Sequence, residues 1–358
     1  MRITAFTKYG RMAASTRQRL LQYMPALQAA GLELDFRPLL DDEYVASLAT
    51  GRRYARRNIA AAYVRRLGEI ALKPLGDVVF VYGELLPWLP SPLERLLLLR
   101  RRPIIYDIDD AFFHTYDRHR NRLVRSILGG KFEPLLRAAA ACICGNAYLR
   151  EYVSRYCHNT VVIPTVVDTD KYRPASTDHA LPPVIGWIGS PTTWPYVRPL
   201  LPLLEDLVSS GRARVKIVGA GAAARDDSFP GLELVSWAEE REIEDVQSFD
   251  MGIMPLSGDE WARGKSGYKL IQYMACGLPV VASPVGVNRD IVIDGKTGLL
   301  AITGEEWRRQ LELLIADSYM RRALGAEGRR RAVAKYSLTA HAPTVVGILK
   351  AAAEQDNR

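Results

Sequence analysis

The sequence lacks several features that would assign it directly to a class of protein. No run approaches the roughly 18 apolar residues that a membrane span requires, and the first residues, interrupted by Lys8 and Arg11, do not have the layout of a signal peptide. The four cysteines show no metal-ligand spacing. Cys142 and Cys144 alternate along an apolar run, so we expect them to pack as small hydrophobic residues. These absences favour a cytoplasmic protein that needs neither disulfides nor a structural metal.

The composition is that of an ordinary globular protein. The chain has 358 residues, of which 48% are hydrophobic and 25% charged, so it is long enough for two domains of usual size. Its formal net charge of +8 indicates an anionic partner. Nucleic acid, a phosphorylated small molecule and an anionic membrane surface all meet that requirement. Nucleic acid is disfavoured because the sequence has no basic motif interleaved with aromatic residues.

The basic residues gather in three clusters in the first half of the chain. The clusters are Arg52, Arg53, Arg56, Arg57, Arg65 and Arg66, in one expected helix; Arg100 to Arg102; and Arg118, Arg120, Arg122 and Arg125. One interpretation is that these residues are solvated helix faces and helix ends. The other is a basic, partly apolar surface that rests on acidic lipid headgroups.

Short apolar runs alternate with longer amphipathic segments along the whole chain. This alternation predicts an α/β fold with parallel sheets covered by helices, and the pattern restarts in the second half, which predicts two Rossmann-like domains. The expected strands are Ile3–Phe6, Leu32–Phe36, Val78–Tyr82, Ile104–Ile108 and Ala141–Cys144, then Val184–Ile188, Val215–Val218, Leu232–Val235, Gly252–Pro255 and Pro279–Ala282. Thr16–Ala30 and Ala55–Leu72 are expected to be helical.

The boundary between the domains follows from a turn-rich segment. We expect an N-terminal domain over residues 1–165 and a C-terminal domain over residues 170–337, with a polar, proline-bearing linker at Ala175–Pro183. The last segment, 338–358, is expected to form a helix that crosses back over the first domain. Two such domains facing each other create a cleft in which a ligand would bind.

The most informative stretch is Lys265–Ser283, which reads KSGYKLIQYMACGLPVVAS. A loop there leads into a helix that opens at Gly267 and stops at Gly277, and such a helix start offers free N–H groups to an anion. Lys265 and Lys269 flank this end and would share one helix face if both were helical. Together they predict a diphosphate site, although a pair of surface lysines beside an ordinary helix start is the alternative.

Residues Lys265–Asp290, KSGYKLIQYMACGLPVVASPVGVNRD, resemble the donor-site signature of the family 4 retaining glycosyltransferases, of the bacterial cell-surface polysaccharide type. Three further segments are similar to that family in the right order: VVIPTVVDTDKYRP, IGWIGSPTT and VGAG. The resemblance implies the GT-B architecture, which is two Rossmann-like domains facing across a central cleft. It also implies a nucleoside-diphosphate sugar as donor substrate, with no cofactor and no metal. Lys265 and Lys269 would stabilise the leaving diphosphate.

The donor-site residues implied by the resemblance are incomplete in this sequence. The family usually carries two glutamates eight positions apart, and here those positions hold Gly264 and Gln272. Gln272 can still accept a hydrogen bond from the ribose, and Asp259 or Glu260 is a candidate replacement for the first glutamate. The family's usual Arg and Lys after the first strand of the second domain are also absent. The expected donor-binding residues are therefore Gly189, Ser190, Gly219, Ser236, Arg263, Gly267 and Gln272.

Two segments of the first domain carry further candidates. The loop after the first strand includes Gly10, Ser15, Thr16, Arg17 and Arg19, which are candidate contacts to the acceptor or the phosphate, although Ser15 or Thr16 could instead cap a helix. The sequence YDIDDA places carboxylates at the end of another strand, where parallel sheets bind ligands. Asp109, Asp110 or His114 is expected to orient the acceptor hydroxyl or the donor sugar.

These observations favour a glycosyltransferase that moves a sugar from a nucleoside diphosphate to a hydroxyl acceptor. The basic first domain suggests a glycan or lipid-linked acceptor in cell-envelope polysaccharide synthesis, with the enzyme cytoplasmic or peripheral at the inner face of the membrane. A sugar-nucleotide epimerase of the same fold and a catalytically weak nucleotide-sugar-binding homologue remain alternatives. A nicotinamide-dependent oxidoreductase is disfavoured because no G-x-G-x-x-G follows the first strand.

Overall fold

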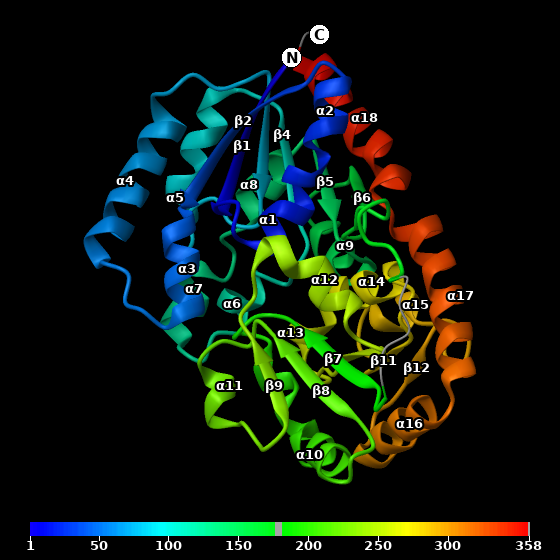
Figure 1. Ribbon diagram of the computed structural model, residues 1–358. Coiled ribbons are helices and arrows are strands. Elements are labelled where there is room, and N and C mark those ends of the chain that lie inside the picture. The colour runs from blue at the N-terminus through cyan, green and yellow to red at the C-terminus, as the bar shows by residue number, and fades with distance from the viewer. Residues whose placement is uncertain (176–180, 357–358) are drawn as a thin grey trace.

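The structure is a computed structural model, and it describes residues 1–175 and 181–356. It contains two parallel six-stranded sheets, each with helices on its faces (Figure 1). Residues 176–180 of the predicted linker and the last two residues of the predicted C-terminal helix lie outside the described part of the chain.

The first sheet has the strand order β2-β1-β3-β4-β5-β6. Its strands are β1 (Arg2–Tyr9), β2 (Glu33–Leu40), β3 (Val78–Tyr82), β4 (Ile104–Ile108), β5 (Ala141–Cys144) and β6 (Thr160–Val162). The helices between them are α1 (Ala14–Arg19), α2 (Met24–Ala29), α3 (Asp42–Thr50), α4 (Arg56–Ala71), α5 (Ser91–Glu94), α6 (His114–Asp117), α7 (Arg122–Leu128), α8 (Glu133–Ala138) and α9 (Ala147–Val153), with 3₁₀ turns at η1 (Leu21–Tyr23) and η2 (Arg95–Arg100).

The second sheet has the order β12-β11-β10-β7-β8-β9. Its strands are β7 (Val184–Ile188), β8 (Arg214–Val218), β9 (Leu232–Val235), β10 (Met251–Met254), β11 (Val280–Ala282) and β12 (Leu299–Leu300). Its helices are α10 (Leu201–Ser209), α11 (Ala223–Asp226), α12 (Glu242–Gln247), α13 (Glu260–Arg263), α14 (Tyr268–Ala275), α15 (Asn288–Ile291), α16 (Gly304–Ala316) and α17 (Ser318–Tyr336), with 3₁₀ turns at η3 (Trp194–Tyr196), η4 (Arg198–Leu200) and η5 (Glu239–Arg241).

The last helix, α18 (Leu338–Asp356), follows α17 and returns to the first sheet. In Figure 1 the red helix runs along the side of the N-terminal sheet, opposite α4. Its buried face is apolar, and Ala342, Val345 and Leu349 belong to the same core cluster as Ile3 and Phe80. The chain therefore crosses between the two halves twice.

Burial explains why the strands could be predicted so closely. Every residue of β3, β4, β5 and β7 is buried, as expected for parallel strands covered on both faces, and such strands read as continuous apolar runs. The cysteines at 142, 144, 157 and 276 are all buried and free. The predicted fold class is confirmed.

One predicted helix is interrupted. The segment Thr16–Ala30 forms α1, the 3₁₀ turn η1 and then α2 rather than one helix. Pro25 stands in the first turn of α2, where its missing N–H is tolerated, whereas within a continuous helix it would remove a hydrogen bond. Arg52 and Arg53 also lie before α4, which begins at Arg56, and not in the helix that was predicted to include them.

Candidate active site in the cleft between the domains

The order of the strands reverses between β7 and β10 of the C-terminal sheet, and we call the region at the carboxyl ends of these two strands the crevice. From β7 the chain proceeds to β8 and β9 on one side of the sheet, and then to β10, β11 and β12 on the other. Parallel sheets bind ligands at such a switch point, here between β7 and β10. Gly189 follows β7 and Gly219 follows β8, and a Cβ at Gly219 would lie 2.4 Å from the Gly189 carbonyl oxygen. The glycines therefore keep the crevice floor free of side chains.

Helix α14 directs Lys269 into this crevice. Its N-cap is Gly267, whose φ of 68° is left-handed and suits glycine. The Lys269 ammonium lies 5.4 Å from the centre of the Trp187 ring, and its Cε would be 2.8 Å from a Cβ at Gly189. Lys265 lies in the loop before the helix, so the condition under which the two lysines would share one helix face is not met.

Lys269 is a cation without a hydrogen-bonded partner in the described part of the chain. Burial, and after it the nearby Lys265 charge, lower the pKa of Lys269 from 10.5 to about 8, while Asp110 acts in the opposite direction. A buried ammonium is unfavourable unless an acceptor compensates for its lost hydration. The position of Lys269 at the switch point is thus suited to an anion.

Lys265 and Asp110 connect the two domains across the cleft. The Lys265 Nζ lies 2.6 Å from the Asp110 Oδ2, and both side chains are 19% exposed. Asn146 of the N-terminal domain supports the same loop by donating from Nδ2 to the carbonyl oxygens of Gly264 at 3.1 Å and Lys265 at 3.3 Å. The structure therefore brings two of the predicted catalytic residues into direct contact.

Gly264 is in contact with the opposite domain. A Cβ at this position would lie 2.5 Å from the Ala111 Cβ and 2.9 Å from the Ala111 backbone nitrogen. Its own φ of −77° suits any residue, so the requirement for glycine comes from the approach of the N-terminal domain and not from the backbone. At the position where the resembling family usually carries a glutamate, this chain thus has a glycine that lies against Ala111, the residue after Asp110.

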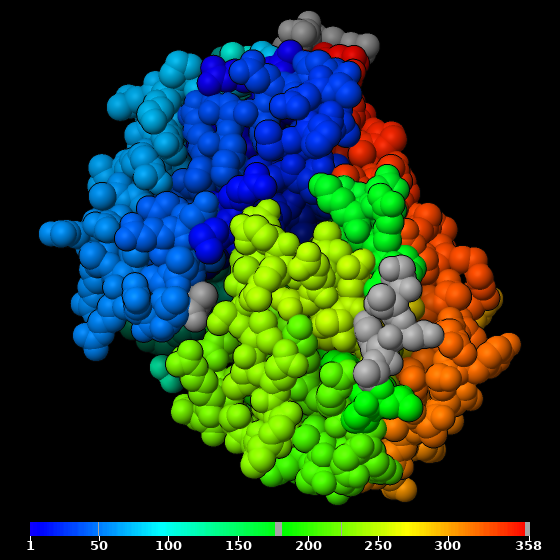
Figure 2. Space-filling model, in the orientation of Figure 1, coloured from blue at the N-terminus to red at the C-terminus, as the bar shows by residue number. Residues whose placement is uncertain are grey.

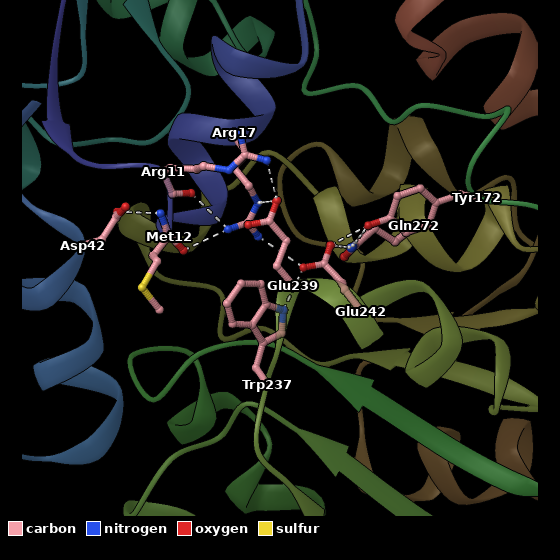
Figure 3. Close-up of polar contacts among 9 residues, drawn as sticks. All are labelled: Arg11, Met12, Arg17, Asp42, Tyr172, Trp237, Glu239, Glu242 and Gln272. Atoms are coloured by element: carbon pink, nitrogen blue, oxygen red, sulfur yellow. Dashed lines mark hydrogen bonds and ion pairs between the residues drawn. The ribbon is translucent and has the colours of Figure 1, made fainter. Parts of the chain in front are cut away.

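Glu242, at the start of α12, accepts hydrogen bonds from four side chains (Figure 3). One oxygen accepts from the Tyr172 hydroxyl and from Gln272 Nε2 at 2.8 Å. The other accepts from Trp237 Nε1 at 2.7 Å and from Arg17 at 3.2 Å. The amide nitrogen of Gln272 is held in this way, and its amide oxygen accepts no hydrogen bond among the described residues.

Arg17 reaches this group of residues from the N-terminal domain. Its guanidinium lies 4.7 Å from the centre of the Trp237 ring, and it also donates to the carbonyl oxygens of Arg11 at 3.2 Å and Met12 at 2.9 Å. The bonds to the loop pre-order the arginine. In Figure 2 the two domains touch at this point, where yellow-green atoms of the segment around residue 240 meet the blue N-terminal domain.

The other residues of the loop after β1 support it from within. Thr16 is fully buried and its hydroxyl donates to the Tyr9 carbonyl oxygen at 3.1 Å. The N-cap of α1 is Ala13, so neither Ser15 nor Thr16 caps it. Gly10 packs against Asp42, whose Oδ1 would be 2.4 Å from a Cβ at that position. Among the predicted residues of this loop, Arg17 is the one that contacts the C-terminal domain.

Arg19 is a buried structural residue and not a ligand contact. Its Nε and Nη2 donate to the two oxygens of Asp107 at 3.0 Å each, and Nη1 donates to the Ile163 carbonyl oxygen at 2.8 Å. Desolvation raises the pKa of Asp109, which accepts a hydrogen bond from the Tyr82 hydroxyl at 2.7 Å. Asp107 and Asp109 thus hold the end of β4, and Asp110 alone of the three faces Lys265.

His114 has partners on both ring nitrogens. Nδ1 lies 2.9 Å from Asp117 and Nε2 lies 2.7 Å from the Tyr148 hydroxyl, both within the N-terminal domain. Among the described residues, no group of three or more His, Cys, Asp or Glu side chains is arranged to hold a metal ion. The geometry places His114 beside the cleft as a support for Tyr148.

Three predicted donor residues lie at the margins of the crevice. Ser190 bonds to Thr192 and Thr193 within its own loop, and Ser236 is exposed at the end of β9. Arg263 lies in a pocket with Asn146 and Tyr148, and this pocket does not include Lys265 or Lys269. Asp259 caps α13 by accepting from the Ala262 N–H at 2.8 Å, and Glu260 pairs with Arg118 at 3.1 Å. Neither acid replaces the missing glutamate.

Glu242 was not identified from the sequence. It lies in the acidic run from Glu239 to Asp245, which reads as an ordinary solvated helix start. The available signal was its position: it begins the helix that follows β9, whose end carries the expected donor-binding residue Ser236.

The basic clusters differ in how much of their charge is exposed. Arg66 is fully buried and donates to the carbonyl oxygens of Leu85, Thr7 and Arg37, so its prediction as a surface residue is wrong. Arg52, Arg53, Arg56, Arg57, Arg120 and Arg122 are exposed. Leu48, Val64, Leu123 and Ile127 are exposed apolar residues on α3, α4 and α7, which lie on the flank away from α18 (Figure 1). Of the described helices, none is long and apolar enough to cross a membrane.

Comparison with known proteins agrees with this geometry. Residues 182–317 match the family model of the glycosyl transferases group 1. No curated protein matches the chain in sequence.

Solved structures match over nearly the whole chain. Sucrose-phosphate synthase from Thermosynechococcus elongatus is 15% identical, with a TM-score of 0.72 and 98% of both chains covered. The Anabaena protein HepE in complex with UDP and glucose is 14% identical, with a TM-score of 0.70, over 98% of this chain and 100% of that one. A glycosyltransferase from Rickettsia africae is 12% identical, with a TM-score of 0.68 and 98% of both chains covered. The chain therefore has the GT-B fold of these proteins, and its C-terminal sheet and crevice lie within the segment that matches the glycosyl transferases group 1.

Proposed function

We propose that the protein is a glycosyltransferase that takes a sugar from a nucleoside-diphosphate donor bound in the C-terminal crevice. The observation that carries this proposal is Lys269, a largely buried ammonium at the β7–β10 switch point without a hydrogen-bonded partner among the described residues. A diphosphate would supply the missing acceptors. The group 1 match over residues 182–317 and the UDP complexes of HepE support the same donor class.

The crevice provides complementary groups for each part of such a donor. Lys269, Lys265 and the first N–H groups of α14 would hold the diphosphate, since helix starts and ammonium groups both favour anions. Gln272 presents its amide oxygen to a ribose hydroxyl, because Glu242 holds the nitrogen. Trp237 offers an indole face beside the base, at present covered by Arg17.

The chemistry requires a stabilised leaving group. As the bond from the anomeric carbon to the diphosphate breaks, negative charge grows on the phosphate oxygen, and a lysine already placed there lowers the barrier without reorganisation. Asp110 bridges to Lys265 from the acceptor domain, so it stands where the acceptor hydroxyl would approach. We extend the proposal to retention of the anomeric configuration, on the basis of the sequence resemblance.

The donor is tested by unfolding the purified chain with UDP, GDP, ADP, CDP and dTDP and with the corresponding glucose and N-acetylglucosamine donors. A ligand at 100 times its dissociation constant adds about 2.7 kcal/mol to the free energy of unfolding. We expect one nucleotide to raise the melting temperature more than the others. Absence of any shift in a folded protein would refute the donor site.

Product analysis then identifies the reaction. Nuclear magnetic resonance of a reaction with the bound donor and a panel of glycan acceptors should show acceptor-dependent release of the nucleoside diphosphate and an α-linked product from an α-linked donor. A change in the donor sugar that needs no acceptor would indicate an epimerase, and binding without any turnover would indicate a nucleotide-sugar-binding protein.

We also propose that the flank formed by α3, α4 and α7 contacts an anionic membrane that carries the acceptor. Exposed arginines lie there beside Leu48, Val64, Leu123 and Ile127, and such a combination favours acidic lipid headgroups. Vesicles with 30% phosphatidylserine should sediment the protein, and Arg56→Gln with Arg57→Gln should reduce this. Arg309→Gln, an exposed arginine on α16, is the control. Equal binding of all variants would contradict the proposed surface.

A further inference from the structure

A pocket of about 340 Å³ is lined by residues of both domains. It is built from the start of α9, the end of α13 and the loop between β11 and α15. Its polar and glycine lining comprises Asn146, Tyr148, Arg263, Gly286, Arg289 and Asp290. This volume is within the range of small-ligand sites, which begins at roughly 300 Å³.

Most N–H donors of the two arginines that line this pocket have no acceptor among the described residues. Within the described part of the chain, the Arg263 guanidinium makes no hydrogen bond or ion pair, and Arg289 donates only from Nε to the Pro284 carbonyl oxygen at 2.5 Å. Asp290 is the one carboxylate of the lining, so the pocket keeps a net positive charge. Two guanidinium forks on one pocket match the paired oxygens of a phosphate or carboxylate.

The remaining lining residues are held in place by other contacts. Asn146 donates to the carbonyl oxygens of Gly264 and Lys265, which fixes the loop from the N-terminal side. Tyr148 is bound to His114 at 2.7 Å. A Cβ at Gly286 would lie 2.6 Å from the Arg263 carbonyl oxygen, so the two C-terminal loops are packed together. The pocket is therefore formed by both domains in the closed arrangement.

The pocket adjoins the proposed reaction centre. Arg263 and Lys265 are two residues apart. Arg263 lines the pocket, whereas the Lys265 Nζ lies 2.6 Å from the Asp110 Oδ2. A molecule that places a hydroxyl beside Asp110 could thus extend past this loop into the pocket. The donor groups Lys269, Gln272 and Trp237 are not part of its lining.

We propose that this pocket binds an anionic group of the acceptor, either a phosphate ester or a sugar carboxylate. The inference rests on the proposed glycosyl transfer, and it narrows the acceptor to an anionic class. Arg263 then belongs to acceptor recognition and not to the donor site. A diphosphate-linked glycan and an acidic glycan share the chemistry that Arg263 and Arg289 recognise.

Titration calorimetry of the full chain tests the pocket with two probes, methyl phosphate and the methyl glycoside of glucuronic acid. The chain is titrated with each probe as wild type, Arg263→Gln, Arg289→Gln and Lys269→Met. Both arginine variants should weaken the better probe by about tenfold or more, because each removes charge-assisted hydrogen bonds. Lys269→Met should leave probe binding unchanged. The probe that binds more tightly shows whether the anionic group of the acceptor is a phosphate or a carboxylate.

Nucleoside diphosphate binding, measured on the same variants, separates this inference from the proposed function. The arginine variants should bind the nucleotide as the wild type does, because both side chains are exposed and lie outside the crevice. The pocket is refuted if neither probe binds the wild type, or if binding survives in Arg263→Gln and Arg289→Gln but is lost in Lys269→Met. If the wild type bound no nucleoside diphosphate, the donor site and not the pocket would be refuted.

Discussion

Arg17 and Glu242 form an ion pair across the cleft, with 3.2 Å between the Arg17 Nη2 and the Glu242 Oε2. The two side chains are only 13% and 9% exposed, so water screens this pair far less than it screens a surface pair. The same guanidinium covers the Trp237 ring. The contact therefore joins the two domains directly beside the proposed nucleotide site.

Arg17→Ala should lower the free energy of unfolding by about 2 kcal/mol, because it leaves a buried acceptor of Glu242 without its charged donor. Arg11→Ala is the matched control. Arg11 pairs with Glu239 in the same region but its side chain is 65% exposed, and such a pair contributes less than about 1 kcal/mol. Denaturant unfolding of both variants measures the difference, and equal effects would show that the Arg17 contact is a surface pair in solution.

Gln272→Glu should destabilise the protein at pH 7 even though it restores the residue usual in the resembling family. Gln272 Nε2 lies 2.8 Å from the Glu242 carboxylate, so the substitution replaces a hydrogen bond with two buried like charges. We expect a loss of about 3 kcal/mol. The loss should shrink as the pH falls from 7 to 5, because the pair can then share a proton.

Thermal unfolding at several pH values tests this prediction. Combining Gln272→Glu with Glu242→Gln reverses the order of amide and carboxylate and should recover much of the stability at pH 7. If Gln272→Glu alone were as stable as the wild type across this pH range, the hydrogen-bond network around Glu242 would be contradicted.

The affinity for a nucleoside diphosphate should fall as the pH rises above 8. Burial lowers the pKa of Lys269 to about 8, so the ammonium that would bind the phosphate is lost above that value. Bound diphosphate favours the charged form, and the affinity should therefore decrease by up to about tenfold per pH unit. Lys269→Arg keeps its charge and should show a flatter profile between pH 7 and 9.5 by calorimetry. Identical profiles would place the pH-sensitive group elsewhere.

Gly264→Ala should disturb the contact between the domains and not the C-terminal domain itself. The added Cβ would lie 2.5 Å from the Ala111 Cβ, and overpacking of this kind costs about 1 to 3 kcal/mol. Gly258→Ala in the same loop region is the control, since its Cβ would meet nothing within 4 Å. Small-angle scattering should show a larger radius of gyration for the first variant alone; an unchanged radius in both would contradict the tight approach at Ala111.

The sequence predicts the local elements better than the contacts between them. The bounds of β3, β4, β5 and β7 follow from apolar runs, because every residue of these strands is buried. Lys269 could be placed at a helix start because Gly267 and Gly277 mark both ends of α14. The pairing of Lys265 with Asp110, 155 residues away, depends on how the two domains meet, and no local spacing encodes it.

The residues whose roles differ from those expected from the sequence have partners that are distant in the sequence. Arg66 and Arg19 carry charge but are buried, because backbone carbonyl oxygens from separate segments, and Asp107 in the case of Arg19, satisfy them. Arginine is usually exposed, so the sequence placed Arg66 in a basic surface cluster and made Arg19 a candidate ligand contact. Glu242 was overlooked because three of its four donors, Arg17, Tyr172 and Gln272, come from distant segments of the chain.

Calorimetric titration of the best-binding nucleoside diphosphate into Lys269→Met at pH 7 tests the central claim most directly. Lys296→Met, an exposed lysine of the same domain, serves as the control. We expect the Lys269 variant to bind about tenfold to hundredfold more weakly than the wild type, with the control unchanged, because one charge-assisted phosphate contact is removed. Equal affinity of all three proteins would contradict the assignment of the β7–β10 crevice as the diphosphate site.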